Sequence, residues 1–277
     1  MSTSEDILTL PAPPADARIA YGTDPLQFGD LRLPAAAGRG DSGAFPLVIL
    51  IHGGYWRNRY DLAYFGHAAA ALTAEGLATW NIEYRRVGDA GGGWPGTLLD
   101  VAAATDYAHT LAAAYLLDVN RVVALGHSAG GQLAAWLAAR HRLAPESGVA
   151  VAMADPLPLR AVVALAGVLN LRRAWELHLS DDAVRGFLGG TPDQHPDRYN
   201  AASPAALLPT GARQTLIHGT ADESVPYAIS RDYADAARAA GEPVELITLP
   251  SAGHFAIVDP RTDEWRIVLR AVRAAVA

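Results

Sequence analysis

A serine between two glycines limits the folds open to this chain more than any other part of its sequence. Gly126, Ser128 and Gly130 form a G-x-S-x-G pattern, in which an aliphatic run ends at Gly126 and a helix-forming segment begins after Ser128. This pattern is typical of a nucleophile elbow, where a strand turns sharply into a helix and holds the serine hydroxyl above the sheet edge. Glycine is needed on both sides because the serine takes a sparsely populated backbone conformation and larger side chains would collide with the strand and the helix. The pattern predicts a strand–turn–helix unit with Ser128 as a nucleophile.

Length, charge and two missing residue types exclude several functional classes. With 277 residues, 51% of them hydrophobic, the chain can bury a large core. Its net charge of −7 argues against a nucleic-acid partner, which would require a basic surface. All 22 basic residues are arginines, which excludes a Schiff-base lysine, a Ser–Lys dyad and a Walker A lysine. Cysteine is also absent, which excludes thiol nucleophiles and thiolate metal ligands. We expect neither a metal ion nor an organic cofactor.

The first 16 residues are acidic and contain prolines, and they lack the basic and apolar runs of a signal peptide. We therefore expect a disordered or loosely docked lead-in and a cytoplasmic protein. No apolar run reaches the roughly 20 residues that a membrane span needs, so we expect no membrane partner. A homodimer stays open, because nothing in the sequence decides the oligomeric state.

Apolar runs alternate with alanine-rich, helix-forming segments along most of the chain. Strands separated by helices at this spacing form a mostly parallel sheet with helices on both faces. Because no linker separates two self-contained halves, we expect residues 1–277 to form a single α/β domain, preceded by an antiparallel hairpin. The hairpin is predicted at 17–22 and 27–33, the later strands at 46–51, 77–84, 121–125, 160–166, 214–219 and 244–249, and the helices at 61–75, 97–117, 129–141, 227–240 and 262–276.

Residues 168–209 interrupt this alternation with prolines, aromatic residues and short helical pieces. An irregular insertion of this length between two core strands is usually functional. We expect a small helical lid over a pocket. The alternative is a surface elaboration that only covers the edge of the sheet.

A serine hydroxyl needs a base beside it, and a neutral histidine is the usual one. His254 is the best placed of the nine histidines, because it stands in a glycine-containing loop directly after the last predicted strand. The carboxyl ends of parallel strands are where such sheets carry reactive groups. We expect His52 and His218 to orient loops, and His127, although adjacent to Ser128, to point into the packing.

A carboxylate should orient this histidine and stabilise its cationic form. Asp222 follows the predicted strand 214–219 and is the preferred candidate. Glu223 is its nearest competitor and Asp259 a weaker one. Without a catalytic partner, any of these carboxylates would be a solvated charge or a helix cap.

The loop 52–56 (His-Gly-Gly-Tyr-Trp) directly follows the predicted strand 46–51. Its glycines allow the backbone to approach a substrate closely, and the helix that begins at Ala129 directs its free N–H groups and positive dipole end toward the same place. The backbone N–H groups of Gly53, Gly54, Tyr55 and Ala129 are the predicted oxyanion hole.

The order Ser128, Asp222, His254, together with the His-Gly-Gly loop, resembles the α/β-hydrolase superfamily from about residue 47 to the C-terminus. The loop is similar to that of hormone-sensitive-lipase-like carboxylesterases. Its tryptophan, two residues after the second glycine, resembles the aryl (kynurenine) formamidase branch. The resemblance implies an α/β-hydrolase fold and hydrolysis of a small-molecule ester or activated amide through an acyl-enzyme.

We therefore expect a serine hydrolase that cleaves carboxylic esters of small or aromatic substrates. Arylformamidase activity is the alternative, and a non-catalytic hydrolase-fold binding module is a more distant one. Tyr55 stands where the lipase-like esterases have a third glycine, which predicts a narrow acyl pocket. The predicted pocket lining consists of the aromatic residues Trp56, Tyr84, Trp94, Trp175 and Phe187.

Overall fold

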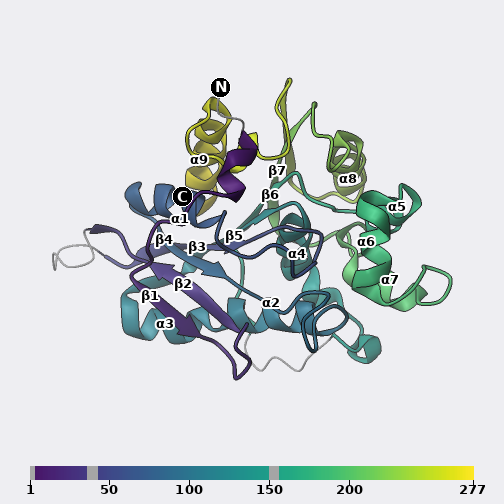
Figure 1. Cartoon of the computed structure of the whole chain (residues 1–277), viewed down its shortest axis with the longest axis horizontal. Helices are drawn as coiled ribbons and strands as arrows, with labels where there is room; N and C mark the ends of the chain where they lie inside the picture. The colour runs from purple at the N-terminus through teal and green to yellow at the C-terminus, as the bar shows by residue number, and fades with distance from the viewer. Residues whose placement is uncertain (1–3, 36–42, 150–155) are drawn as a thin grey trace.

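The computed structural model describes residues 4–35, 43–149 and 156–277. Its strands are β1 (Ala17–Ala20), β2 (Phe28–Arg32), β3 (Phe45–Ile51), β4 (Ala78–Ile82), β5 (Leu117–His127), β6 (Ala161–Leu165), β7 (Arg213–Gly219) and β8 (Val244–Leu249). They form one eight-stranded sheet in the order β1-β2-β4-β3-β5-β6-β7-β8 (Figure 1). The pairs β1–β2 and β2–β4 are antiparallel and all other neighbours are parallel. The predicted hairpin and mostly parallel sheet are confirmed.

Helices cover both faces of this sheet, as a mostly parallel sheet requires. They are α1 (Gly66–Ala74), α2 (Gly96–Asp106), α3 (Ala108–Tyr115), α4 (Ala129–Ala139), α5 (Leu171–Glu176), α6 (Leu179–Leu188), α7 (Pro196–Ala202), α8 (Tyr227–Ala239) and α9 (Asp263–Val276). In Figure 1, α1 and α9 lie on one side of the sheet, and α2 and α3 lie on the other.

The side chains of β3 explain why this strand reads as an unbroken apolar run. Leu47, Ile49 and Ile51 belong to the core under α2, α3 and α4, whereas Val48 and Leu50 belong to the core under α1 and α9. All five side chains are fully buried. A strand buried on both faces needs apolar residues at every position, and for this reason it lacks the alternation of a half-exposed strand.

Three local predictions are wrong. The segment 97–117, expected to be one helix, forms the two helices α2 and α3, and Leu117 already belongs to β5. The break follows Asp106, whose carboxylate binds Arg140 and the N–H of Leu157. The helix expected at 61–75 begins only at Gly66. Part of the expected loose lead-in is a docked 3₁₀ helix, η1 (Ser4–Leu8), because Ile7 is 1% exposed and anchors it. Local patterns do not encode these long-range contacts.

Within the described residues, no helix is both long and apolar enough to cross a membrane. The insertion 168–209 contains α5, α6, α7 and a further 3₁₀ turn, η5 (Pro204–Ala206). Figure 1 places these three helices together at one end of the sheet, near α8.

Backbone packs directly against backbone where β5 turns into α4. A Cβ atom added to Gly126 would lie 2.0 Å from the carbonyl oxygen of Gly130, and one added to Gly130 would lie 2.0 Å from that of Ile51. Neither site can accommodate even a methyl group, since both neighbours are main-chain atoms. The two glycines of the motif are therefore required by the close packing of α4 against β3 and β5.

We expect Gly130→Ala to destabilise the fold by about 2–3 kcal/mol, because the new methyl group overlaps fixed backbone. Gly43→Ala is the matched control, since no atom of the described residues lies within 4 Å of its added Cβ atom, and it should change stability by less than about 0.5 kcal/mol. Chemical denaturation measures both values. Equal stability of the two variants would contradict this account of the motif.

Candidate active site

Ser128 occupies the turn between β5 and α4 in a strained conformation. Its backbone has φ 57° and ψ −121°, a region that non-glycine residues rarely adopt. Backbone hydrogen bonds hold it there: its N–H donates to the carbonyl of Leu165 at 2.8 Å, and its own carbonyl accepts from Gly131 at 2.9 Å. The backbone thus makes the sharp strand-to-helix turn that the G-x-S-x-G motif predicts.

Asp222 and His254 form a short hydrogen bond beyond the carboxyl ends of β7 and β8. His254 Nδ1 lies 2.7 Å from Asp222 Oδ2, and the two side chains are 8% and 0% exposed. Because Nδ1 binds the carboxylate, Nε2 is left as the basic nitrogen. The other carboxylate oxygen, Oδ1, accepts the backbone N–H groups of Ser224 and Val225 at 2.9 and 2.8 Å.

His218 supplies a further donor to Asp222 that the sequence did not predict. Its Nε2 lies 3.2 Å from Asp222 Oδ2 and 2.9 Å from the carbonyl of Val225, and its Nδ1 lies 2.7 Å from the hydroxyl of Ser230. His218 therefore orients the loop, as expected, and also holds the carboxylate. Burial alone would raise the pKa of Asp222, but the hydrogen bonds from His218 and His254 outweigh it and hold the pKa well below its usual value.

Ser128 and His254 line one cavity of about 360 Å³. Gly54, Tyr55 and Tyr64 line the same cavity. Three segments that are distant in the sequence thus border a single space large enough for a small ester. Glu223 and Asp259 take no part in it: Asp259 instead forms an ion pair with Arg261 at 2.6 Å, which together with backbone contacts lowers the pKa of Asp259 against the effect of burial.

The N–H groups of Gly54, Tyr55 and Ala129 have no hydrogen-bond partner among the described residues. They are therefore free to bind an oxyanion. Gly53 differs, because its N–H donates to the hydroxyl of Tyr64 at 2.7 Å. The prediction of Gly53 as an oxyanion donor is thus wrong. Its glycine is needed for a different reason: an added Cβ atom would lie 2.8 Å from the Cβ of Ser128.

Tyr55 bridges the loop after β3 and the loop that carries Asp222. Its hydroxyl donates to the carbonyl of Ser224, and burial raises the pKa of Tyr55 to about 12. The residue has a left-handed backbone with φ 51°. Tyr55 is therefore a fixed wall of the cavity.

The five aromatic residues predicted to line the pocket do not border this cavity. Trp56 and Phe187 are fully buried and stack on each other with ring centroids 4.5 Å apart, and Trp56 donates to Gln132 at 2.9 Å. Tyr84 stacks on His52 at 4.4 Å. These rings are buried in the core, where their apolar surface is removed from water, and they support the loop 52–56 from the core side. The other two, Trp94 and Trp175, are half-buried elsewhere.

The cavity wall contains side chains that sequence reasoning missed. The sequence offered one indication of them, because residues 57–60 directly follow the loop 52–56. In the structure these residues fold back over Gly54, whose added Cβ would lie 2.6 Å from Tyr60. Tyr64 and Phe255 come from the segments before α1 and after His254. The lining residues not predicted are Glu5, Leu8, Arg57, Arg59, Tyr60, Tyr64, His127, Ser180, Ser224 and Phe255.

A buried pair holds the loop from its other side. His52 Nε2 lies 2.9 Å from Glu83 Oε1, and His52 Nδ1 lies 2.8 Å from the carbonyl of Gly53. Burial alone would raise the pKa of Glu83, but His52 and Arg86 outweigh it and lower the pKa. His52 thus orients the loop, as the sequence indicated.

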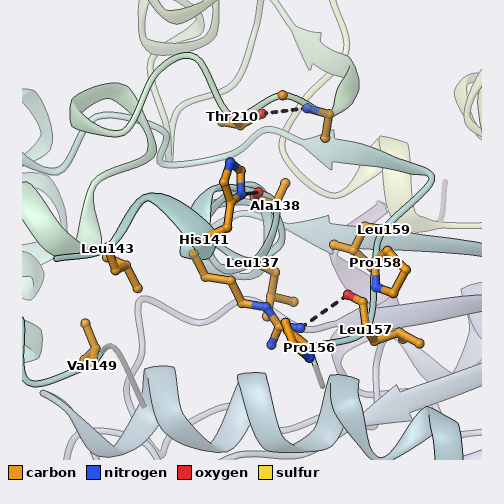
Figure 2. Close-up of a pocket in the computed structure, with 13 residues that line it drawn as sticks. Leu137, Ala138, His141, Leu143, Val149, Pro156, Leu157, Pro158, Leu159 and Thr210 are labelled. Atoms are coloured by element: carbon orange, nitrogen blue, oxygen red, sulfur yellow. Dashed lines mark hydrogen bonds between the residues drawn. The ribbon is translucent and has the colours of Figure 1, made fainter. Parts of the chain in front are cut away.

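A separate cavity of about 480 Å³ lies at the far end of α4 (Figure 2). Its polar side chains are occupied, since Arg140 pairs with Asp106 and the hydroxyl of Thr210 donates to Glu242. Among the described parts of the chain, no three histidine, aspartate or glutamate side chains converge as metal ligands do.

Similar proteins of known structure share the fold. A truncated carbohydrate esterase from gut microbiota superposes with a TM-score of 0.78 at 22% identity, over 96% of this chain and 97% of that chain. An esterase from Thermogutta terrifontis, bound to propionate, superposes with a TM-score of 0.72 at 23% identity, over 94% and 93%. These likenesses establish an α/β-hydrolase fold.

Curated relatives are longer proteins. Esterase LipC from Mycobacterium tuberculosis is 29% identical over 87% of this chain and 60% of its own length. A probable isoprenylcysteine alpha-carbonyl methylesterase from Arabidopsis thaliana is 25% identical over 85% and 56%. The chain thus spans less than two thirds of the length of these relatives. Residues 30–236 match the BD-FAE family model. Since this match covers well over half of the sequence, the chain belongs to the BD-FAE family of α/β hydrolases.

Proposed function

We propose that this protein hydrolyses carboxylic esters of small or aromatic substrates through an acyl-enzyme, with Ser128, His254 and Asp222 as its catalytic residues. One observation carries the proposal: a strained elbow serine shares a cavity with a histidine whose Nδ1 is held by a fully hydrogen-bonded carboxylate. This arrangement of nucleophile, base and orienting group defines a serine hydrolase.

The reaction follows from the positions of these groups. Ser128 Oγ attacks the ester carbonyl while His254 Nε2 accepts its proton, and Asp222 stabilises the resulting imidazolium. The N–H groups of Gly54, Tyr55 and Ala129 bind the oxyanion of the tetrahedral intermediate. His254 then protonates the departing alkoxide. A water molecule releases the acyl group by the same steps, with His254 again as the base.

The curated relatives support an ester substrate, since LipC is named an esterase and the plant relatives are named methylesterases. A Thermogutta terrifontis esterase with this fold has been captured phosphonylated by sarin. Arylformamidase activity is less favoured. The resemblance to formamidases rested on Trp56, which is buried against Phe187 and does not line the cavity.

We further propose that residues 168–209 cover the cavity within a single domain that spans residues 1–277. Ser180 lines the cavity, and the guanidinium of Arg57 donates to the carbonyls of Ser180 and Asp181. These contacts tie the insertion to the loop that holds Gly54. A cytoplasmic location remains a prediction, and the oligomeric state, including a homodimer, stays open.

The nucleophile can be tested by labelling. A fluorophosphonate should modify the wild-type protein once, at Ser128, because only an activated serine reacts, and Ser128→Ala should abolish both labelling and hydrolysis of p-nitrophenyl acetate. Ser224→Ala, which changes another serine of the cavity wall, should still be labelled at Ser128.

A parallel assay with N-formylkynurenine separates the two substrate classes. Faster turnover of the formamide than of every ester would contradict the ester proposal.

The pH dependence should report one group. The pKa of Asp222 is held low by its hydrogen bonds, and the pKa of His127 is lowered by burial and by the nearby His254. Neither residue should therefore add a second protonation step at weakly acidic to neutral pH. We expect log kcat/KM to fall with a slope of one as the pH is lowered, because the proposed mechanism uses a single neutral base. A slope of two over this range would contradict this assignment.

Asp222→Asn should lower kcat by about 10³–10⁴-fold at neutral pH, because an amide neither stabilises the imidazolium nor selects the required tautomer.

The carboxylate of Asp222 also contributes to the stability of the folded protein. Its pKa is lower in the folded protein than the unfolded value of about 3.9, so its contribution is complete above that pH and is lost as the pH falls through the folded pKa. Denaturation of both proteins at about pH 7 and pH 3 measures this difference, which should shrink at the lower pH.

Tyr55 should limit the length of the acyl group, because its ring is a fixed wall of the cavity. Tyr55→Gly should shift the preference along a series of p-nitrophenyl esters from acetate toward longer chains. Tyr55→Phe, which retains the ring, is the control and should keep the wild-type preference. An unchanged preference in the glycine variant would refute this role.

A further inference from the structure

Tyr64 stands just before α1, in the segment where the sequence predicts a helix and the structure forms none. Other bonds hold this segment in place: the N–H of Leu62 donates to Glu83 at 3.2 Å, and its carbonyl accepts from Asn81 at 3.0 Å. Residues 61–65 are thus tied to the carboxyl end of β4. This attachment places the side chain of Tyr64, which is 5% exposed, between the loops of the candidate site.

The hydroxyl of Tyr64 has two partners from two of these loops. It accepts the backbone N–H of Gly53 at 2.7 Å and lies 2.9 Å from His127 Nδ1. Burial raises the pKa of Tyr64 well above its usual value, so the hydroxyl keeps its proton. With Gly53 donating to the oxygen, that proton is available to His127.

His127 continues the connection. Its Nε2 lies 3.1 Å from the backbone carbonyl of His254, and its ring centroid is 4.5 Å from that of His254. Burial lowers the pKa of His127 well below its usual value, and the neighbouring His254 lowers it further, so His127 is neutral. A neutral ring carries one proton. A carbonyl can only accept, so the proton is on Nε2 and Nδ1 accepts from Tyr64.

These bonds form one directional chain: Gly53 N–H to Tyr64 oxygen, Tyr64 O–H to His127 Nδ1, and His127 Nε2–H to the His254 carbonyl. The chain begins in the oxyanion loop, passes through the residue before Ser128 and ends at the backbone of the proposed base. Every donor in it has an acceptor, which a buried polar network requires if it is to favour a single geometry.

We propose that Tyr64 is a positioning residue for ester hydrolysis, which sets the oxyanion loop and the His254 loop relative to Ser128 through His127. This inference rests on the proposed function. Tyr64 transfers no proton to substrate and binds no oxyanion. It acts by keeping the N–H groups of Gly54 and Tyr55 and the ring of His254 aligned with Ser128. Gly54 and Tyr55 directly follow Gly53, the first donor of the hydrogen-bond chain, and the carbonyl of His254 is its last acceptor.

Tyr64→Phe retains the ring and removes both hydroxyl bonds. We expect kcat for p-nitrophenyl acetate to fall about 10–100-fold, since removal of an oxyanion donor costs 10²–10³-fold and a displaced donor costs less. KM should stay within about twofold, because the cavity wall keeps its shape. Tyr233→Phe is the matched control: this buried tyrosine donates to Gln214 at 3.0 Å, near the amino end of β7 and away from the site. It should lose similar thermal stability and keep its kcat.

A sulfur-for-oxygen substitution separates positioning from stability. Sulfur is a weak hydrogen-bond acceptor, so an intact oxyanion hole should hydrolyse an ester much faster than the corresponding thionoester. In Tyr64→Phe this rate ratio should fall, because the ester loses more than the thionoester does. The inference is overturned if Tyr64→Phe matches Tyr233→Phe in melting temperature, kcat and rate ratio.

The hydrogen-bond chain can also be tested without turnover. In ¹⁵N-histidine spectra at pH 7, assigned with a His127→Asn variant, His127 should be the Nε2–H tautomer, and its Nδ1 shift should change in Tyr64→Phe. A wild-type protein that hydrolyses no ester would remove the proposed function, whereas the tautomer would still report on the chain. The Nδ1–H tautomer, or an unchanged shift in the variant, would refute the chain itself.

Discussion

The close contact of main chain with main chain around Ser128 is the constraint on which the rest of the molecule depends. The helix α4 can approach β3 and β5 only because Gly126 and Gly130 have no side chain, and this approach forces the serine into its strained turn. Such strain persists where the surroundings over-determine the backbone. Here the carbonyls of Leu165 and Ser128 supply the opposing hydrogen bonds, and the buried core on both faces of the sheet supplies the rigidity.

Several hydrogen bonds hold the buried carboxylate of the candidate site, and all of them stabilise its ionised form. Asp222 accepts bonds from two backbone N–H groups and two histidines, so its buried charge is fully compensated. Burying a carboxylate is costly unless it is hydrogen-bonded in this way. The consequence for chemistry is a carboxylate that stays ionised and a histidine whose tautomer is defined. Orientation and electrostatics therefore come from the same set of bonds.

The loop after β3 is supported on two sides by groups of different character. Below it, His52, Glu83 and Tyr84 form a buried polar and aromatic layer. Beside it, Tyr64 and His127 connect it to the segments that carry Ser128 and His254. The single hydrogen bond of Gly53 to Tyr64 removes one expected oxyanion donor and at the same time ties that loop to the elbow. A residue that appears from sequence to bind substrate thus acts as an anchor.

Local sequence determined the strands, most helices and the identity of the elbow, because apolar periodicity and glycine spacing reflect short-range sterics. The sequence also indicated that Ser128, Asp222 and His254 lie at one edge of the sheet, because each follows a parallel strand and such strands have their carboxyl ends at the same edge. Only the tertiary structure decided which aromatic rings border the cavity. Trp56 and Tyr55 are adjacent in sequence, yet the first stacks on Phe187 in the core and the second forms the wall. Burial partners from distant segments make that choice, and no local pattern records them.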